Sequence, residues 1–318
     1  MAPDGDAGIA WRLHPALRHL AGVRTDLSPG LLAAVRASLD ERRRESAGAV
    51  DTAGVDISEQ SVPAVGGRPI PVRMYRGGGP PAPAVLYLHS GAFVLGNLDT
   101  DHRQCVELAR RGRCAVLSVD YRLAPEHPHP AAYSDALAVL RWAVSNAAAL
   151  HLDPDRVAVA GSSAGGALAA GLAQRAAAGD APTVVFQLLH QPVLDDRMTP
   201  SRREFTATPG FDGAAVDLMW RYVAGDSVPQ DAVPARTAGL SGLAPALVTC
   251  SELDPLRDEA IDYAARLLRA GVATELHVYP GTCHGFDSLV PDWEVSTGLF
   301  ALQGDALRRA FECQKMPR

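Results

Sequence analysis

The sequence predicts an α/β fold in which a mostly parallel sheet is flanked by helices. Short, continuous apolar runs alternate with longer helical stretches, which is the pattern of buried parallel strands joined by crossover helices. The chain has 318 residues and a hydrophobic fraction of 47%, so it is long and apolar enough to bury a large core. We therefore expect one large α/β domain or two modest ones.

The first 48 or so residues are expected to be helical. Apolar side chains recur there near helical spacing, at Leu31, Leu32, Val35 and Leu39. The basic run Arg42-Arg43-Arg44 is then interpreted as a solvated helix end. From residue 51 the period changes to two, and the alternation from Ile70 to Tyr75 predicts a half-buried strand near the edge of the sheet.

The apolar runs predict further strands at 84–88, 115–119, 157–160, 184–189, 245–249 and 275–279. Helices are expected between or after them, at about 101–112, 131–148, 164–178, 255–270 and 293–312. Residues 199–232 interrupt the alternation with a polar and aromatic excursion, which we interpret as a cap insertion over one edge of the sheet. The expected division is an N-terminal helical cap segment (1–50), a first core part (51–198), the cap insertion (199–232) and a second core part (233–318).

Charge and composition exclude several classes of protein. With 30 Lys and Arg against 36 Asp and Glu, a net charge of −6 predicts no nucleic-acid partner. The N-terminus has acidic residues where a signal peptide needs basic ones, so a cytoplasmic location is expected. An uncharged stretch at 157–174 contains two Ser and four Gly, too polar for stable membrane insertion. Five scattered cysteines predict reduced thiols, with neither disulfides nor a metal site.

The first chemical motif is Gly161-Ser162-Ser163-Ala164-Gly165, which matches G-x-S-x-G. The motif follows the apolar run at 157–160 and opens an Ala-rich helix, so it has the strand–turn–helix context that exposes a nucleophilic serine. The alternative is a structural serine in a tight turn. We interpret Ser163 as the nucleophile.

A serine hydroxyl needs a base to take its proton, and that base needs an acid to orient it. In the hydrolases that carry this elbow, the chain order is Ser, then Asp or Glu, then His. His284 lies in a Gly-punctuated loop after the last expected strand and is interpreted as the base. Two other histidines that follow Ser163 are not interpreted as the base. His277 is explained as a residue within that strand, and His190 as a hydrogen-bonded polar residue at the end of another strand.

Three carboxylates follow the strand at 245–249 and are candidates for the acid: Glu252, Asp254 and Asp258. Asp254 is preferred because Pro255 after it disfavours helical backbone and holds it in the loop. Asp258 falls in the first turns of the next helix, where the helix dipole alone explains an acid. Glu252 stays open as a weaker alternative.

The loop after the strand at 84–88 reads His89-Ser90-Gly91-Ala92-Phe93. Backbone N–H groups of small residues in such a loop can bind the oxyanion of a tetrahedral intermediate. We expect the oxyanion hole to be formed by the N–H groups of Gly91, Ala92 and Ala164. An ordinary glycine turn is the alternative.

Five ordered motifs carry a family resemblance: HSGAF, YRLAPEHPHPAA (121–132), GSSAGG, DPLRDE (254–259) and HGF (284–286). The chain from about residue 50 resembles the hormone-sensitive-lipase-like (family IV) esterases, especially their actinobacterial esterase/lipase branch. The resemblance implies an α/β-hydrolase fold with a mostly parallel eight-stranded sheet flanked by helices and a small helical cap. It also implies the triad Ser163, Asp254 and His284, no cofactor, and a possible homodimer.

The chain departs from the family pattern at three positions. Ser90 and Ala92 stand where the family usually has glycine, and Ser162 stands where it commonly has Asp. Both loop substitutions keep a backbone N–H, but an alanine tolerates positive φ badly.

The expected function is a serine carboxylesterase that hydrolyses short acyl or acetyl esters of small molecules through an acyl-enzyme. The alternatives are acyl transfer or biosynthetic acyl chemistry on the same triad, or a non-catalytic ligand-binding protein. Bulky side chains at Phe93, Phe211, Met219 and Trp220 are expected to close a small apolar substrate pocket that favours acyl chains of roughly two to eight carbons. In a simpler alternative, Met219 and Trp220 pack the cap onto the core and do not line the pocket.

Overall fold

An eight-stranded sheet forms the centre of the computed structural model, which describes residues 9–63, 67–225 and 227–313. The strand order is β1-β2-β4-β3-β5-β6-β7-β8. The pairs β1–β2 and β2–β4 are antiparallel, and every other neighbouring pair is parallel. The expected α/β-hydrolase fold with a mostly parallel eight-stranded sheet is confirmed.

The strands that apolar runs predict are present with small shifts in their ends. The observed strands are β1 (Asp56–Val62), β2 (Ile70–Arg76), β3 (Ala82–Leu88), β4 (Ala115–Val119), β5 (Leu152–Ser162), β6 (Phe186–His190), β7 (Ala246–Leu253) and β8 (Thr274–Cys283). Sequence patterning did not predict β1. Most of its side chains are exposed, because it is an edge strand that pairs only with β2, so it carries little apolar alternation.

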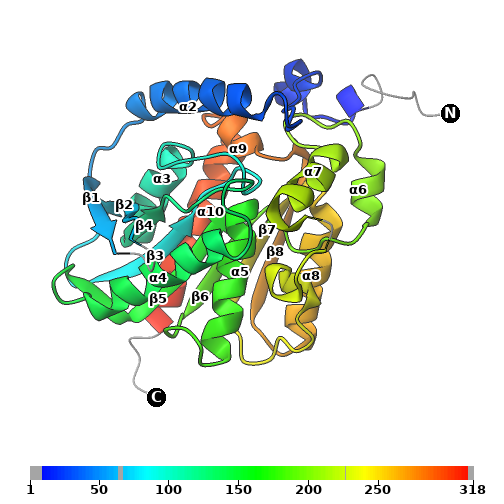
Figure 1. Cartoon of the computed structure of the whole chain (residues 1–318). Helices are drawn as coiled ribbons and strands as arrows, with labels where there is room; N and C mark the ends of the chain where they lie inside the picture. The colour runs from blue at the N-terminus through cyan, green and yellow to red at the C-terminus, as the bar shows by residue number, and fades with distance from the viewer. Residues whose placement is uncertain (1–8, 64–66, 226, 314–318) are drawn as a thin grey trace.

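Helices cover both faces of the sheet (Figure 1). One face packs against α3 (His102–Gly112) and α10 (Glu294–Cys313), which also contact each other. The other face packs against α4 (Ala131–Ser145), α5 (Ala164–Ala177) and α8 (Arg257–Arg269). Strands β3 and β4 are buried along their whole length because both faces of the sheet are covered.

The N-terminal segment from residue 9 and residues 199–225 lie at one end of the molecule, where α2 (Leu32–Gly48) runs across the top of Figure 1. The second segment contains α6 (Pro200–Glu204) and α7 (Gly213–Ala224). The two segments touch, since the Tyr222 hydroxyl donates to the Leu27 carbonyl at 2.7 Å. The division into core and cap stays a prediction, and residues 1–8 of the expected cap segment lie outside the described ranges.

Arg43 corrects the interpretation of the basic run as a solvated helix end. Arg42 and Arg44 are exposed, but the Arg43 side chain is only 20% exposed and lies well inside α2. Successive side chains of a helix point in different directions, so three consecutive residues of α2 cannot all face solvent when one side of the helix covers the protein. The run therefore combines two solvated residues with one that faces the interior.

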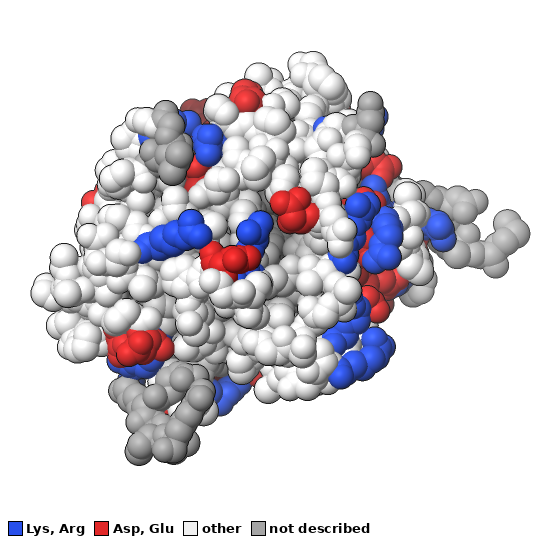
Figure 2. Space-filling model, turned by 60° about the horizontal axis from the view of Figure 1, so that its bottom comes forward, with Lys and Arg blue, Asp and Glu red and all other residues white. Residues whose placement is uncertain are grey.

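Charge on the face shown in Figure 2 is mixed, with Arg side chains interspersed among Asp and Glu on a largely uncharged surface. The five cysteines are free thiols, four of them buried, and burial raises the pKa of Cys114 to about 12. Within the described ranges, no helix combines the length and apolar character that crossing a bilayer requires. Nor do those residues bring together a group of His, Cys, Asp or Glu suited to a metal ion.

Candidate active site

Ser163 lies at a sharp turn between β5 and α5. Its backbone adopts φ +56° and ψ −116°, a positive-φ conformation that is strained for a residue with a side chain. The flanking glycines make the turn possible. A Cβ on Gly165 would come within 1.9 Å of the Leu88 carbonyl oxygen, and one on Gly161 within 2.2 Å of the Gly165 carbonyl oxygen.

The structure brings Ser163, His284 and Asp254 together from three separate segments. His284 Nε2 lies 3.0 Å from Ser163 Oγ, and His284 Nδ1 lies 2.8 Å from Asp254 Oδ2. Asp254 follows β7 and His284 follows β8, so the ends of parallel strands deliver both side chains to one edge of the sheet. Asp254 is fully buried, whereas the His284 side chain is 12% exposed.

The two other candidate acids point elsewhere. Asp258 accepts a hydrogen bond from the N–H of Ser201 and pairs with Arg257. Glu252 accepts from the N–H of Gly281, in the turn that precedes the histidine loop. Only Asp254, among these three residues, contacts the His284 ring.

The loop after β3 has an unusual backbone at three consecutive residues. Gly91, Ala92 and Phe93 have φ values of +132°, +54° and +58°. Ala92 therefore occupies a left-handed conformation that glycine adopts without strain, at the position where the family usually has glycine. In the described part of the chain, nothing accepts a hydrogen bond from the N–H groups of Gly91 and Ala92, so both donors remain available beside Ser163.

Ser90 shows what the second loop substitution does. Its N–H and its hydroxyl both donate to the buried Asp101 carboxylate, at 2.8 and 3.0 Å. The Tyr87 hydroxyl donates to the same carboxylate at 3.1 Å. A hydroxyl in place of the usual glycine thus adds one more hydrogen bond that ties the loop after β3 to the N-cap of α3.

A cavity of about 190 Å³ opens onto Ser163 and His284. Its walls come from the N-terminal segment, α2, the loop after β3, the residues before α7, and α9 (Phe286–Leu289). Phe211 lines it, with its ring tilted against His284 at a centroid distance of 5.0 Å. Leu27, Leu39, Leu95 and Leu289 add apolar surface.

The other three residues expected in the substrate pocket lie elsewhere. Phe93 lines a smaller neighbouring pocket between α4 and α5. Met219 and Trp220 are buried in the main core cluster and line neither cavity. Their burial fits the simpler interpretation, in which both side chains pack the cap onto the core.

Gln191, the residue after β6, is hydrogen-bonded to the loop that carries His284. Its side-chain Oε1 accepts from the N–H of Gly285 at 2.6 Å, and its Nε2 donates to Ser251 Oγ at 3.0 Å. The Ser251 hydroxyl in turn donates to the Cys283 carbonyl at 2.9 Å. Both neighbours of His284 are therefore hydrogen-bonded to one buried pair of polar side chains.

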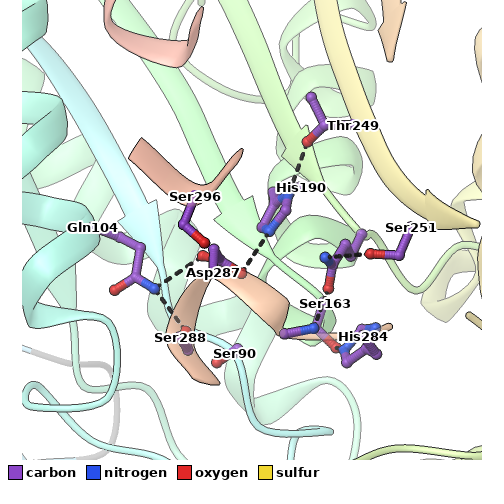
Figure 3. Close-up of polar contacts among 12 residues, drawn as sticks. Ser90, Gln104, Ser163, His190, Thr249, Ser251, His284, Asp287, Ser288 and Ser296 are labelled. Atoms are coloured by element: carbon purple, nitrogen blue, oxygen red, sulfur yellow. Dashed lines mark hydrogen bonds and ion pairs between the residues drawn. The ribbon is translucent and has the colours of Figure 1, made fainter. Parts of the chain in front are cut away.

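A second buried network lies beneath the histidine loop (Figure 3). His190 Nε2 lies 3.1 Å from Asp287 Oδ1, and its Nδ1 lies 2.7 Å from Thr249 Oγ1. Burial acts to raise the pKa of Asp287, but attraction to His190 and hydrogen bonds from His190 and Gln104 outweigh it and lower that pKa. The carbonyl of His190 also accepts from the N–H of Ser163 at 2.8 Å. Sequence patterning identified His190 as a bonded polar residue but gave no sign of its partner, 97 positions away.

Comparison with known proteins agrees with this fold. The alpha/beta hydrolase fold family matches residues 85–288. Carboxylesterase NlhH of Mycobacterium tuberculosis is 42% identical to this chain, in an alignment that covers 76% of this chain and 80% of NlhH. Ethyl acetate hydrolase of Pseudomonas putida is 39% identical, and that alignment covers 72% of this chain and 75% of the relative. Esterase LipW of Mycobacterium marinum has a similar crystal structure, with a TM-score of 0.93 and 58% identity over 95% of this chain and 97% of that one.

The fold and the serine-centred site define a hydrolase of the α/β type. The chain belongs to the alpha/beta hydrolase fold family, among the hormone-sensitive-lipase-like esterases, and is a carboxylic ester hydrolase. The expected family and enzyme class are thereby confirmed.

Proposed function

We propose that this protein hydrolyses short-chain acyl or acetyl esters of small molecules, with Ser163, His284 and Asp254 as its catalytic triad. The observation that carries the proposal is the unbroken chain of contacts from Ser163 Oγ through the His284 ring to Asp254, at 3.0 and 2.8 Å, at the wall of a cavity. The site residues and the mechanism are proposals that this geometry supports.

In the first half of the reaction, Ser163 Oγ attacks the ester carbonyl carbon while His284 Nε2 takes the hydroxyl proton. The tetrahedral intermediate collapses, His284 returns the proton to the departing alkoxide, and an acyl-enzyme and an alcohol result. Asp254 accepts the hydrogen bond of His284 Nδ1–H, which fixes the ring tautomer and stabilises the imidazolium. Its complete burial leaves that carboxylate without competition from bulk water.

In the second half, a water molecule deprotonated by His284 attacks the acyl-enzyme. The bond to Ser163 Oγ then breaks, His284 returns the proton to that oxygen, and the acid is released. In both halves the negative oxygen develops near the N–H groups of Gly91, Ala92 and Ala164, which we propose as the oxyanion hole. The free N–H groups of Gly91 and Ala92 and the strained backbone of their loop support this role. A preorganised donor of this kind contributes about 100-fold to 1,000-fold in kcat.

The preference for short acyl groups rests on the size of the cavity and on Phe211. A cavity of about 190 Å³ suits a small ester, and Phe211 narrows it by packing its ring against His284. The ethyl acetate hydrolase relative carries a name that fits such a substrate. We expect kcat/KM to peak for acyl groups of roughly two to eight carbons.

A 4-nitrophenyl ester series from acetate to palmitate, with wild type and Ser163→Ala, tests the proposal. We expect hydrolysis of the short esters by wild type and a loss of about 10,000-fold or more in Ser163→Ala. A palmitate optimum would contradict the size limit. Binding without turnover by wild type would favour a ligand-binding protein, and a rate that rises with an added alcohol acceptor would favour acyl transfer.

A further inference from the structure

Arg43 of α2 lines the same cavity as Ser163 and His284. In the described part of the chain, it alone among the cavity-lining residues carries a formal charge at neutral pH, because no Lys, Asp or Glu joins it there. The remaining wall is apolar or consists of hydroxyl groups, backbone and the His284 ring. The cavity therefore presents one cation to whatever enters it.

The charge of Arg43 is poorly neutralised by the protein. Its Nη1 is buried and makes no hydrogen bond, and the Asp40 carboxylate is 4.0 Å away, beyond hydrogen-bond distance. Asp101 also acts on it electrostatically, but the oxygens of that carboxylate already accept from Ser90 and Tyr87. Burial lowers the pKa of Arg43, as expected for a buried cation whose charge is not fully neutralised by nearby carboxylates.

A partly buried cation without a hydrogen-bonded counter-ion costs folding free energy unless a ligand supplies the missing partner. A guanidinium offers a planar fork of N–H donors that matches a carboxylate. We propose that Arg43 binds a carboxylate carried by the substrate, so that the enzyme prefers small esters that also contain a free carboxylate. This inference rests on the proposed esterase function and names the substrate class of that site.

Asp40 competes for Arg43 in the free enzyme. It is one helical turn away on α2, and its Oδ1 is also buried without a hydrogen bond. Removing its charge should leave Arg43 freer to bind a substrate carboxylate. The two neighbours on the same helix are therefore expected to act in opposite directions on substrate preference.

The test compares matched esters that differ by one carboxylate. Monomethyl and dimethyl glutarate place the charge on the acyl side, and 4-acetoxybenzoate and its methyl ester place it on the alcohol side. For each pair, the ratio of kcat/KM for the anionic ester to kcat/KM for the neutral one is measured by proton release at low ionic strength. In at least one pair, Arg43→Gln should lower this ratio about tenfold or more relative to wild type, and Asp40→Asn should raise it.

Arg44→Gln is the matched control, because it removes the same charge from an exposed position on the same helix. It should leave the ratio near that of wild type. Should Arg43→Gln fail to fold, Arg43→Lys keeps the charge but loses the fork, and an intermediate ratio would support the proposal. Equal ratios in wild type and both Arg43 variants would overturn it. Failure of wild type to hydrolyse even the neutral esters would instead refute the proposed function.

Discussion

The side-chain oxygen of Gln191 accepts a 2.6 Å hydrogen bond from the N–H of Gly285, the residue that follows His284. Gln191 itself directly follows His190, whose carbonyl accepts from the N–H of Ser163. The end of β6 is thus hydrogen-bonded both to the turn that carries Ser163 and to the loop that carries His284. This arrangement fixes the distance between Ser163 and His284 through one rigid strand end.

Gln191→Leu should lower kcat by about 10-fold to 100-fold, because small displacements of a reacting group are costly, while KM changes little. The measurement is steady-state kinetics on a short 4-nitrophenyl ester, with the melting temperature recorded in parallel. Gln191→Glu keeps an acceptor for Gly285 and should recover part of the loss.

Gln174→Leu is the matched control for that variant. Gln174 bonds Tyr263 and the Pro234 carbonyl, away from the site, so its loss should lower stability without lowering kcat. If Gln191→Leu also lowered only the melting temperature, its role would be structural and not positional.

Asp254→Asn should lower kcat by about 1,000-fold to 10,000-fold, because an amide no longer stabilises the His284 imidazolium or fixes its tautomer. Asp258→Asn should have a much smaller effect, since Asp258 bonds Ser201 and Arg257 instead. Circular dichroism would confirm that both variants fold. The reverse order of activity losses would show that the acid is misassigned.

Acidification should destabilise the fold through His89. Burial lowers its pKa to about 4 from an ordinary value of 6.5, since the neutral ring is enclosed and stacked on Tyr121. The unfolded chain takes up this proton near pH 6.5 and the folded chain only near pH 4. The free energy of unfolding should therefore fall by about 1.4 kcal/mol per pH unit as pH drops through that window.

Urea denaturation of wild type and His89→Gln from pH 7 to pH 4 isolates this contribution. The difference in unfolding free energy between the two proteins should shrink toward acid pH. A difference that stays constant over the whole range would contradict the assignment.

Gly165→Ala should abolish folding or lower the melting temperature severely, because the added Cβ would meet the backbone oxygen of Leu88 at 1.9 Å. Thermal unfolding followed by circular dichroism measures this. Gly298→Ala is the control, since Gly298 is exposed on α10 with open space around it. That change should stabilise the protein by about 0.5 to 1 kcal/mol. A Gly165→Ala variant as stable as wild type would contradict the close approach of α5 to β3.

Strong local signals made the core and the candidate triad predictable from the sequence. The apolar runs of β3 to β7 are mostly buried, and β8 is a half-buried strand at the edge of the sheet. Ser163, Asp254 and His284 each follow one of these predicted strands. Residues whose role depends on distant partners were not predictable. Gln191 acts through Ser251 and Gly285, 60 and 94 positions away, and no local pattern marks it.

The cap was the least predictable part for a related reason. An amphipathic pattern shows that one side of a helix is buried but not which cavity or core it faces. Trp220 was therefore expected beside the substrate and packs into the core, whereas Arg43 was expected in solvent and lines the cavity.

Covalent labelling tests the central claim most directly. A phosphonate or phosphate ester with a 4-nitrophenoxide leaving group forms a stable adduct with an activated serine, and mass spectrometry of the digested protein locates it. We predict one adduct per chain, on Ser163, with a matching loss of esterase activity. Ser163→Ala should form no adduct, and His284→Ala should form it more slowly than wild type. Hydrolysis that survives labelling, or an adduct on Ser162 or any other residue, would contradict the proposed triad.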